Sequence, residues 1–381
     1  MRILVVLPDA SLGGITVSAI NFCNECVSRG DNIDLLVMDQ TRVVIPGVKQ
    51  LFIEGLSQYW NLDAVKIKKA GWKKKLMLIP LGIVKRLTNK RNRWLPIIFR
   101  GYKEKGRYDV ALAYSQCAPC YYFVANCVEA DKLVALIHGN LRYMHETRTW
   151  DYMFPKFDKI ACVSNAVGIG FKEAFPGVAD RITTLYNMFD VEGIIAKSKR
   201  KSDYTVDPTK TNIITVARHD NAHKKLYRIP EACKELRDRG IEDIHWYIAG
   251  DGNDMEYNIK VAEKLGVTDL ITFCGAVDNP FALISQCDFS VLTSVTEAFS
   301  MSVIESKILC KPLVVMRYLG LEEALNDGKE GLIAEQSISS LCDCISRLMN
   351  DRELLLKMTN YLKAHPYSND KCYNQLLSIV R

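Results

Sequence analysis

Two glutamates and the residues between them form the pattern with the clearest chemical meaning in this sequence. Glu297 lies in a predicted loop after a strand, and Glu305 lies about one and a half turns into the helix that follows. Between them, Phe299, Ser300 and Met301 would present backbone N–H groups at the start of that helix. Free N–H groups and the helix dipole both favour a bound anion. The pattern therefore predicts a phosphate site with a carboxylate on either side.

Basic residues and a glycine follow the other strands predicted in this half of the chain. Arg218 and Lys224 come after the strand at residues 212–217, and Gly250 comes after the strand at residues 246–249. Open parallel sheets bind their ligands outside the carboxyl ends of the strands. We therefore expect an anionic ligand at this edge of the sheet.

A glycine pair follows the first predicted strand of the chain. Gly13 and Gly14 end the turn after residues 2–8 and open a predicted helix. Glycines let a backbone approach an anion at a helix N-terminus, although a tight turn would require them as well. Neither opening strand is followed by the G-x-G-x-x-G fingerprint, which disfavours a nicotinamide enzyme.

Taken in order, these motifs resemble the retaining glycosyltransferases of family 4, of the type that assembles bacterial polysaccharides, and this resemblance implies the GT-B fold. The resemblance covers nearly the whole chain and is strongest over residues 212–335. Besides the paired glutamates, it rests on VAR at 216–218, AGDG at 249–252, FCGAV at 273–277, and GLEE at 320–323 followed by Asp327, Gly328 and GLI at 331–333.

The resemblance implies a role for each residue of the predicted phosphate site. Glu305 would accept hydrogen bonds from the nucleotide ribose, and Glu297 would hold hydroxyls of the donor sugar. Arg218 and Lys224 would neutralise the diphosphate. Lys225 is the alternative to Lys224. We favour Lys224, because it keeps the usual spacing to the next helix.

Residues elsewhere in the chain complete the donor site that the resemblance implies. Gly14 would bring the backbone of the first domain to the diphosphate across an interdomain cleft, and His138, in the run LIHGN, would lie near the donor sugar. Val277 would lie where the chain passes the base. The expected donor-binding residues are Gly14, Arg218, Lys224, Gly250, Val277, Glu297, Phe299, Ser300, Met301 and Glu305; the expected catalytic residues are His138, Glu297, Arg218 and Lys224.

The sequence departs from the family pattern near both parts of this site. Ala298 and Ser300 stand where the family commonly has glycine, and Gly139 with Asn140 replaces the usual context after His138.

We expect neither a metal ion nor a resident cofactor. Arg218 and Lys224 supply positive charge where a metal would otherwise act, and no convincing Asp-x-Asp ends a strand. The spacings Cys23-x-x-Cys26 and Cys117-x-x-Cys120 suit zinc ligands, but both pairs lie in predicted helices or helix starts without nearby histidines.

The length and strand pattern indicate α/β architecture with two doubly wound, Rossmann-like domains that face a cleft. Strands alternate with amphipathic helices in both halves of the 381 residues. We expect an N-terminal acceptor-binding domain at residues 1–196 and a nucleotide-sugar-binding domain at residues 197–371. A polar linker is predicted at residues 197–210. A helix at residues 372–381 would follow and could pack back on the N-terminal domain.

The composition is that of an ordinary globular protein. Apolar residues make up 48% of the chain and charged residues 25%, which excludes a disordered, collagen-like or disulfide-framework chain. No stretch has the length and hydropathy of a membrane span, and the N-terminus lacks the pattern of a signal peptide, so we expect a cytoplasmic protein. The thirteen cysteines should then be reduced thiols that serve mostly as small core residues.

A basic segment interrupts this otherwise acidic chain. Residues 66–107 contain fifteen lysines and arginines but only one acid, Glu104. Trp72, Trp94 and many aliphatic residues alternate with these charges, which is typical of segments in a membrane interface. A solvated helix face is the alternative, and nucleic acid is disfavoured because no binding motif accompanies the charge. The segment Lys66 to Arg107 therefore predicts peripheral attachment to the anionic inner face of a membrane.

The function that these features favour is metal-independent transfer of a hexose-type sugar from a nucleotide diphosphate donor, preferably UDP. The transfer would retain configuration, and the acceptor would be a saccharide, preferably lipid-linked, in cell-surface polysaccharide synthesis. Two alternatives are a sugar-nucleotide epimerase of the same fold and a non-catalytic glycan-binding protein.

Overall fold

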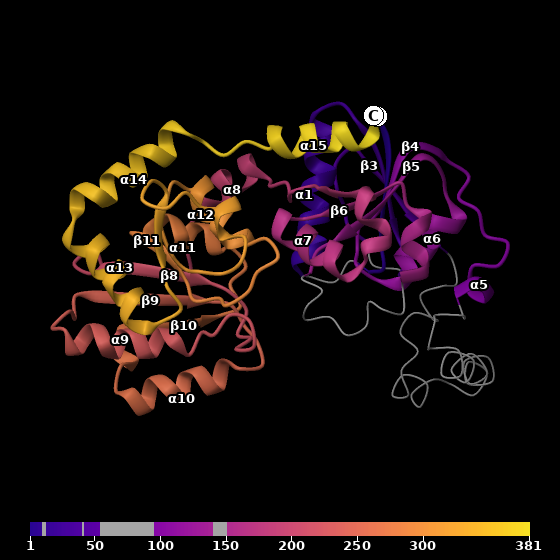
Figure 1. Cartoon of the computed structure of the whole chain (residues 1–381). Coiled ribbons are helices and arrows are strands. Elements are labelled where there is room, and N and C mark those ends of the chain that lie inside the picture. The colour runs from indigo at the N-terminus through magenta and orange to yellow at the C-terminus, as the bar shows by residue number, and fades with distance from the viewer. Residues whose placement is uncertain (10–12, 40–41, 54–94, 140–150) are drawn as a thin grey trace, which may run out of the picture. The chain divides into compact units, whose positions relative to one another are not determined.

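The chain folds into two compact units, and each contains one parallel β-sheet with helices between its strands (Figure 1). Unit 1 comprises Met1–Phe189 and Asn369–Arg381, and unit 2 comprises Asp190–Ser368. Unit 2 thus begins before the expected boundary at residue 197. The predicted fold class, with two doubly wound α/β domains, is confirmed. The computed structural model describes residues 1–9, 13–39, 42–53, 95–139 and 151–381.

The sheet of unit 1 has the strand order β3-β2-β1-β4-β5-β6-β7 within the described residues, and every pairing is parallel. Runs of Val, Ile and Leu that are buried on both faces form its central strands, as parallel sheets require. The strands are β1 (Arg2–Leu7), β2 (Asn32–Val37), β3 (Val48–Phe52), β4 (Arg107–Ala113), β5 (Glu129–Ile137), β6 (Lys159–Cys162) and β7 (Ile182–Thr184).

Aromatic side chains join several helices of unit 1. The ring of Tyr121 on α6 lies 5.5 Å from that of Phe154 on η4, which lies 5.0 Å from Phe171 on α7. Such edge-to-face pairs add to the free energy of burying the rings. The helices are α1 (Gly14–Ser28), α5 (Leu95–Ile98), α6 (Ala118–Cys127), η4 (Asp151–Lys156), α7 (Asn165–Ala174), η5 (Pro176–Arg181) and α15 (Asp370–Val380).

The last helix, α15, packs in unit 1 beside α1. Asp370 forms an ion pair with Arg29 at 2.7 Å, and the Asn369 amide donates to Glu25 at 2.7 Å. Tyr373 donates its hydroxyl hydrogen to Asp31 at 2.8 Å. Cys372, Leu376 and Ile379 are its buried residues, spaced to lie on one face of the helix. These contacts hold the final segment against the first helix of the chain.

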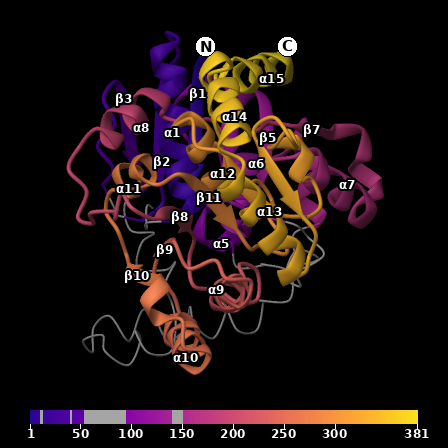
Figure 2. The ribbon, with the colours of Figure 1, turned by 90° about the vertical axis from the view of Figure 1, so that its left-hand side faces the viewer.

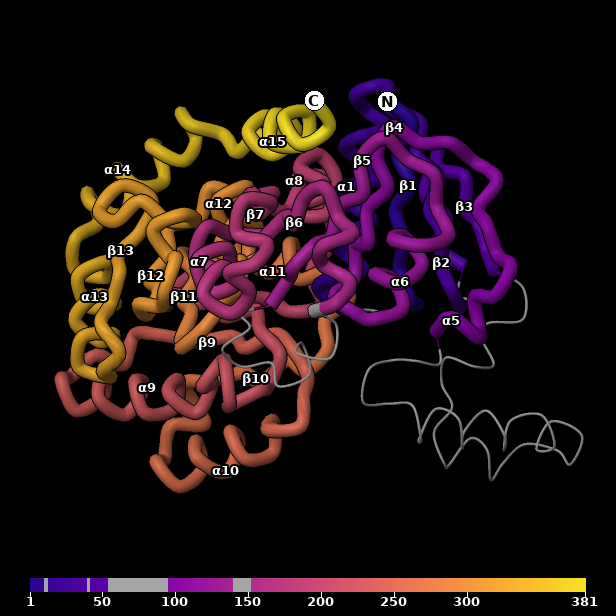
Figure 3. Tube along the Cα trace, turned by 45° about the vertical axis from the view of Figure 1, so that its right-hand side comes forward, coloured from indigo at the N-terminus to yellow at the C-terminus, as the bar shows by residue number. Residues whose placement is uncertain are grey.

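The sheet of unit 2 has the order β10-β9-β8-β11-β12-β13 within the described residues, again with parallel pairings. Figure 3 traces the chain through β12, β13 and α13, which lie together. The strands are β8 (Thr211–Val216), β9 (Ile244–Ala249), β10 (Ile271–Gly275), β11 (Phe289–Leu292), β12 (Leu313–Met316) and β13 (Gly331–Ala334).

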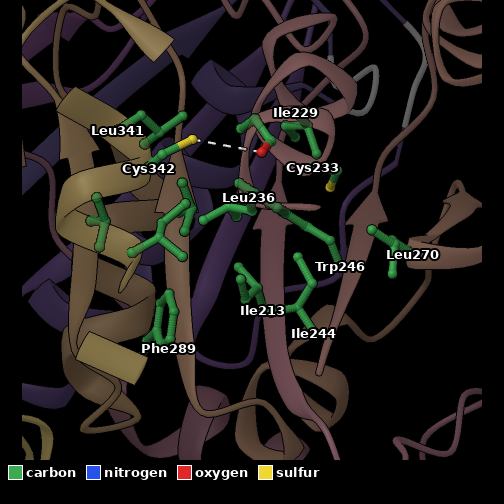
Figure 4. Close-up of a cluster of buried hydrophobic side chains, with 14 of the residues drawn as sticks. Ile213, Ile229, Cys233, Leu236, Ile244, Trp246, Leu270, Phe289, Leu341 and Cys342 are labelled. Atoms are coloured by element: carbon green, nitrogen blue, oxygen red, sulfur yellow. Dashed lines mark hydrogen bonds between the residues drawn. The ribbon is translucent and has the colours of Figure 1, made fainter. Parts of the chain in front are cut away.

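Helices cover both faces of the unit 2 sheet. On one face, α9 and α13 bury Leu236 and Leu341 against Trp246 of β9 (Figure 4). On the other face, α11 packs against β8 and α8. Figure 2 shows α9 with its neighbour α10. The helices are α8 (Val191–Ser198), α9 (Arg228–Asp238), α10 (Met255–Leu265), η6 (Thr268–Leu270), α11 (Pro280–Gln286), α12 (Met301–Ile308), η7 (Leu321–Glu323), α13 (Ile338–Asn350) and α14 (Arg352–Ala364).

The strand order defines one ligand-binding position in each sheet. In unit 1 the connections from β1 and β4 run in opposite directions, and in unit 2 those from β8 and β11 do. Loops therefore diverge at the carboxyl ends of these neighbouring strands, where open α/β sheets bind ligands. In unit 2 these loops carry the predicted cations and the paired glutamates.

Two strands, β3 and β13, have only weak sequence signals. The edge strand β3 reads VKQLF and is half-exposed, so it lacks a long apolar run. The strand β13 reads GLIA and contains only four residues. The predicted basic segment is described only from Leu95 onward, and its residues 66–94 lie outside the described part of the chain. None of the helices within the described ranges combines the length and hydropathy needed to cross a membrane.

Candidate active site

An ion pair joins the two loops that diverge in unit 2. The Lys224 ammonium, in the loop after β8, lies 2.6 Å from Oε1 of Glu297, in the loop after β11. The Ser294 hydroxyl donates to the same oxygen at 2.7 Å. The Glu297 side chain is only 10% exposed, and that of Lys224 is 23% exposed. Burial weakens solvent screening, so this pair fixes both side chains more firmly than a surface ion pair would.

Backbone hydrogen bonds reinforce the position of Lys224. Its carbonyl oxygen accepts from the Thr293 hydroxyl at 2.7 Å, and the carbonyl of His223 accepts from the N–H of Val295 at 2.9 Å. Lys225 instead has a positive φ of 51°, and its ammonium lies 5.7 Å from the centre of the Tyr227 ring. Of the two lysines that the sequence left as alternatives, the structure places Lys224 beside Glu297.

Arg218 occupies the exposed part of the same loop. Its side chain is 73% exposed, and its guanidinium lies 3.3 Å from Asp220. Solvent screens such a pair strongly, so Arg218 can turn toward an anionic ligand at little cost.

A buried polar network supports the loop after β8. His219 is 1% exposed, and its Nδ1 accepts from the amide of Asn258 at 2.9 Å. The Asn221 amide donates to Asn258 at 2.8 Å, and the Asn221 N–H donates to Asp254 at 2.6 Å. Burial lowers the pKa of His219, so the ring stays neutral. The network ties the polar loop after β8 to the helix α10.

Two glycines allow the loops after β8 and β9 to approach each other. A Cβ atom on Gly250 would lie 2.0 Å from the carbonyl oxygen of Ala217, and one on Gly252 would lie 2.4 Å from that of His219. Both glycines also have positive φ values, of 148° and 155°. No side chain fits at either position. The Gly250 N–H donates to Gly275 O at 2.7 Å, which joins this loop to the end of β10.

The second glutamate lies on α12 in a desolvated position. Ser300 is the extended N-cap residue of this helix, and its hydroxyl makes no capping hydrogen bond. Glu305 is half-buried, and burial raises its pKa to about 7. Its carboxylate has no hydrogen-bond or ion-pair partner among the residues that the structure describes. A desolvated acceptor of this kind gains from any ligand that donates hydrogen bonds to it.

The remaining expected residues of unit 2 lie close to these groups in sequence. Phe299 and Met301 flank the N-cap of α12, so the chain reaches the helix start directly after Glu297. Val277 is half-buried between β10 and α11.

Unit 1 holds the two other predicted residues, Gly14 and His138. Gly14 is the first residue of α1, it is exposed, and a Cβ there would meet nothing within 4 Å. His138 follows β5, and its Nε2 donates to the carbonyl of Tyr114 at 2.8 Å, because a carbonyl can only accept. Burial lowers the pKa of His138 to about 4. The ring is therefore neutral near pH 7, with Nδ1 as its acceptor.

Gln116 holds the backbone around this histidine. Its Oε1 accepts from the N–H of His138 at 3.0 Å and from that of Gly139 at 2.9 Å. The turn after β4 thus positions the turn after β5.

Sequence reasoning did not assign roles to Ser294, Thr293, Asn258 or Gln116. All four are polar, and the first two follow β11 directly, which is a usable signal for a site residue. Asn258 and Gln116 act through contacts that only the folded chain reveals. Within the described ranges, no group of three or more His, Cys, Asp or Glu residues could hold a metal ion.

Comparison with known proteins finds a family similarity for unit 2. Residues 197–365, which make up most of unit 2, match the model of the glycosyl transferases group 1. The chain is 30% identical to the alpha-D-kanosaminyltransferase of Streptomyces kanamyceticus over 166 residues, or 42% of this chain and 43% of that protein.

A second relative is the N,N'-diacetylbacillosaminyl-diphospho-undecaprenol alpha-1,3-N-acetylgalactosaminyltransferase of Campylobacter jejuni. It is 26% identical over 200 residues, or 52% of this chain and 47% of that protein. The chain thus spans less than half the length of these two curated relatives.

The fold of the whole chain is similar to that of Anabaena Alr3699/HepE, whose crystal structure contains UDP and glucose. The TM-score is 0.69 at 16% identity, and the match covers 99% of this chain and 98% of that one. At this identity the likeness concerns the fold, and it identifies the two parallel-sheet domains as those of the GT-B architecture.

The raised pKa of Glu305 predicts a stability that depends on pH. Between its ordinary pKa of 4.5 and its folded value of about 7, the folded chain binds the proton more tightly than the unfolded chain. The contribution of Glu305 to stability therefore falls as the pH rises through this window. Glu305→Gln should therefore raise the free energy of unfolding relative to wild type, and by more at high pH. The gain at about pH 8 should exceed the gain at about pH 5 by about 1–3 kcal/mol.

Urea unfolding at the two pH values would measure this difference. Glu263→Gln is the matched control, because Glu263 is an exposed glutamate on α10. If Glu305→Gln stabilised the chain equally at both pH values, this would contradict the conclusion that the Glu305 carboxylate is desolvated.

Proposed function

We propose that this chain transfers a hexose-type sugar from a nucleoside diphosphate donor, with UDP as the nucleotide, to a saccharide acceptor with retention of configuration. The observation that carries the proposal is the desolvated Glu305 carboxylate, which follows a loop held by the Lys224–Glu297 pair. The ribose of a nucleotide offers the hydroxyl donors that such a carboxylate lacks. The match of residues 197–365 to the glycosyl transferases group 1 and the UDP and glucose bound to the similar HepE fold support this assignment.

The cations of unit 2 would stabilise the leaving nucleoside diphosphate. Negative charge develops on the diphosphate as the bond to the sugar breaks, and preorganised positive groups lower the free energy of that state. Lys224 is already fixed by Glu297, whereas Arg218 is exposed and free to close on the ligand. The helix α12 begins shortly after Glu297. The positive end of its dipole adds to the charge of the two cations.

Glu297 and His138 would contact the sugar. Lys224 and Ser294 both bind Oε1 of Glu297, and within the described residues no partner binds Oε2, so this oxygen can accept from a sugar hydroxyl. His138 is neutral and offers Nδ1 as an acceptor, so its expected part is orientation of a hydroxyl rather than charge stabilisation. Departure and attack on the same face of the sugar would give retention.

Lys224 and Lys225 form a matched pair for testing the diphosphate contact. Lys224→Met should weaken UDP binding about 10- to 100-fold, because a fixed cation is lost, whereas Lys225→Met should change it less than about 3-fold. Isothermal titration with UDP and with uridine measures the two affinities. Equal losses for the two variants, or a loss for uridine as large as that for UDP, would contradict the role given to Lys224.

A turnover assay tests the reaction itself. With a panel of nucleotide sugars, Glu297→Gln should lower kcat at least about 10-fold while UDP affinity changes little, because Glu297 is proposed to orient the sugar. The wild-type activity should survive EDTA, since Lys224 and Arg218 supply the positive charge. Incubation with the donor alone distinguishes transfer from epimerisation, because an epimerase changes the donor sugar without an acceptor. An unchanged kcat, or loss in EDTA with recovery on adding magnesium, would contradict the proposal.

The acceptor is proposed to be lipid-linked, with the enzyme bound peripherally to the inner face of a membrane in the synthesis of a cell-surface polysaccharide. The basic segment at residues 66–107 supports this proposal, as does the diphospho-undecaprenol group in the name of the Campylobacter jejuni relative. Each basic residue near an anionic surface contributes about 1 kcal/mol.

Binding to anionic liposomes should therefore be salt-sensitive and should be lost when Lys73, Lys74 and Lys75 are changed to Glu. These lysines lie outside the described residues. Flotation measures the bound fraction, and UDP affinity should stay at the wild-type value. Wild-type protein that stays unbound even at low salt would favour a soluble acceptor.

A further inference from the structure

A pair of cysteines lies at the point in unit 1 where the loops after β1 and β4 diverge. Cys117 is the extended N-cap residue of α6, with φ of −145° and ψ of 146°, and Cys120 lies in the first turn. The run Cys-Ala-Pro-Cys places Pro119 where a helix tolerates its missing N–H. Thiols at a helix N-terminus with this spacing are favoured for redox chemistry.

The two cysteines lie three residues apart at the start of α6 and differ in exposure. Cys117 is partly exposed, whereas Cys120 is completely buried. The neighbouring Cys120 lowers the pKa of the Cys117 thiol. We propose that Cys117 and Cys120 form a redox-active dithiol that closes to a disulfide by exchange with a low-molecular-weight disulfide such as oxidised glutathione.

The exchange proceeds in two balanced steps. The Cys117 thiolate attacks one sulfur of the oxidant, forms a mixed disulfide and releases the first thiolate. Cys120 then loses its proton to solvent and attacks the Cys117 sulfur, which closes the intramolecular disulfide and releases the second thiolate. The sum is oxidation of two cysteine thiols and reduction of one glutathione disulfide to two glutathione thiols.

The pKa values of the two thiols shift in opposite directions, which gives the two cysteines separate roles. Cys120 and Ser115 lower the pKa of Cys117, against the opposing effects of burial and Asp9. Burial raises the pKa of Cys120 well above its ordinary value. Cys117 is therefore the attacking thiolate, and Cys120 is the resolving thiol.

The same spacing elsewhere in the chain provides a built-in comparison. Cys23 and Cys26 lie inside α1, both completely buried. Burial raises the pKa of Cys23 to about 12 and that of Cys26 further. Spacing alone therefore does not give reactivity, and the Cys23–Cys26 pair should stay reduced.

The dithiol lies next to the residues that hold His138. Gln116, directly before Cys117, accepts from the backbone of His138 and Gly139, and the Tyr114 carbonyl fixes the imidazole. Closing a disulfide at residues 117 and 120 constrains this same turn. Oxidation should therefore change the surroundings of His138.

Peptide mapping of the full chain tests the site. Native protein is equilibrated with oxidised and reduced glutathione, quenched with acid, denatured and alkylated. The tryptic peptide of residues 108–132 should carry a single alkyl group, on Cys127, and should be two hydrogens lighter than the singly alkylated dithiol. The peptide of residues 3–29 should keep both alkyl groups. Full alkylation of the first peptide under strongly oxidising conditions would overturn the proposal, as would pairing of Cys117 with any other cysteine.

Single variants test the two assigned parts. Cys120→Ala should trap one glutathione on Cys117, because the resolving thiol is missing, and Cys117→Ala should leave Cys120 unmodified. The reverse pattern, or no adduct in either variant, would contradict the mechanism.

The coupling to His138 has its own readout. In protein labelled with ¹³C at the histidine rings, the His138 resonance, assigned with His138→Gln, should shift on oxidation of the wild type and stay in place for the Cys117→Ala/Cys120→Ala double variant. A resonance that does not move on full oxidation would overturn the coupling.

Discussion

The ion pair between Lys224 and Glu297 is the interaction on which the site in unit 2 depends. It connects two loops whose residues are 73 positions apart in sequence, and it sets both a cation and a carboxylate at one edge of the sheet. A carboxylate buried as deeply as Glu297 would be strongly destabilising without a partner. The hydrogen bonds from Ser294 and Thr293 then fix the two ends of the pair in place. The geometry of the site is thus a consequence of charge neutralisation in a poorly solvated position.

The strand order makes this interaction available. Because β8 and β11 are neighbours, the loops that follow them start a few ångströms apart, although β9 and β10 separate them in sequence. The glycines at 250 and 252 bring the loop after β9 against the same place. Three separate stretches of sequence therefore build one surface, because the sheet places the ends of their strands side by side.

Much of this arrangement could be predicted from the residues. Continuous β-branched runs located the central strands within a few positions. The motif order located the loops that carry Arg218 and Glu297 and the helix that carries Glu305. The half-exposed VKQLF edge strand gave no comparable signal. The pattern also could not distinguish Lys224 from Lys225, because the choice depends on a left-handed backbone conformation at Lys225 and on a contact with a distant loop. That Glu305 has no partner within the described residues likewise depends on what packs around α12, and no local pattern carries that information.

The return of α15 to unit 1 has a mechanical consequence. Since β1 and α15 both belong to unit 1, the chain enters and leaves unit 2 through two separate connections. A tensile load applied to the two chain ends would act first on the contacts of α15 with Glu25, Arg29 and Asp31, which resist it as a clamp. Unit 2 would bear no extension until that clamp released, so it is shielded from force in the manner of an inserted domain.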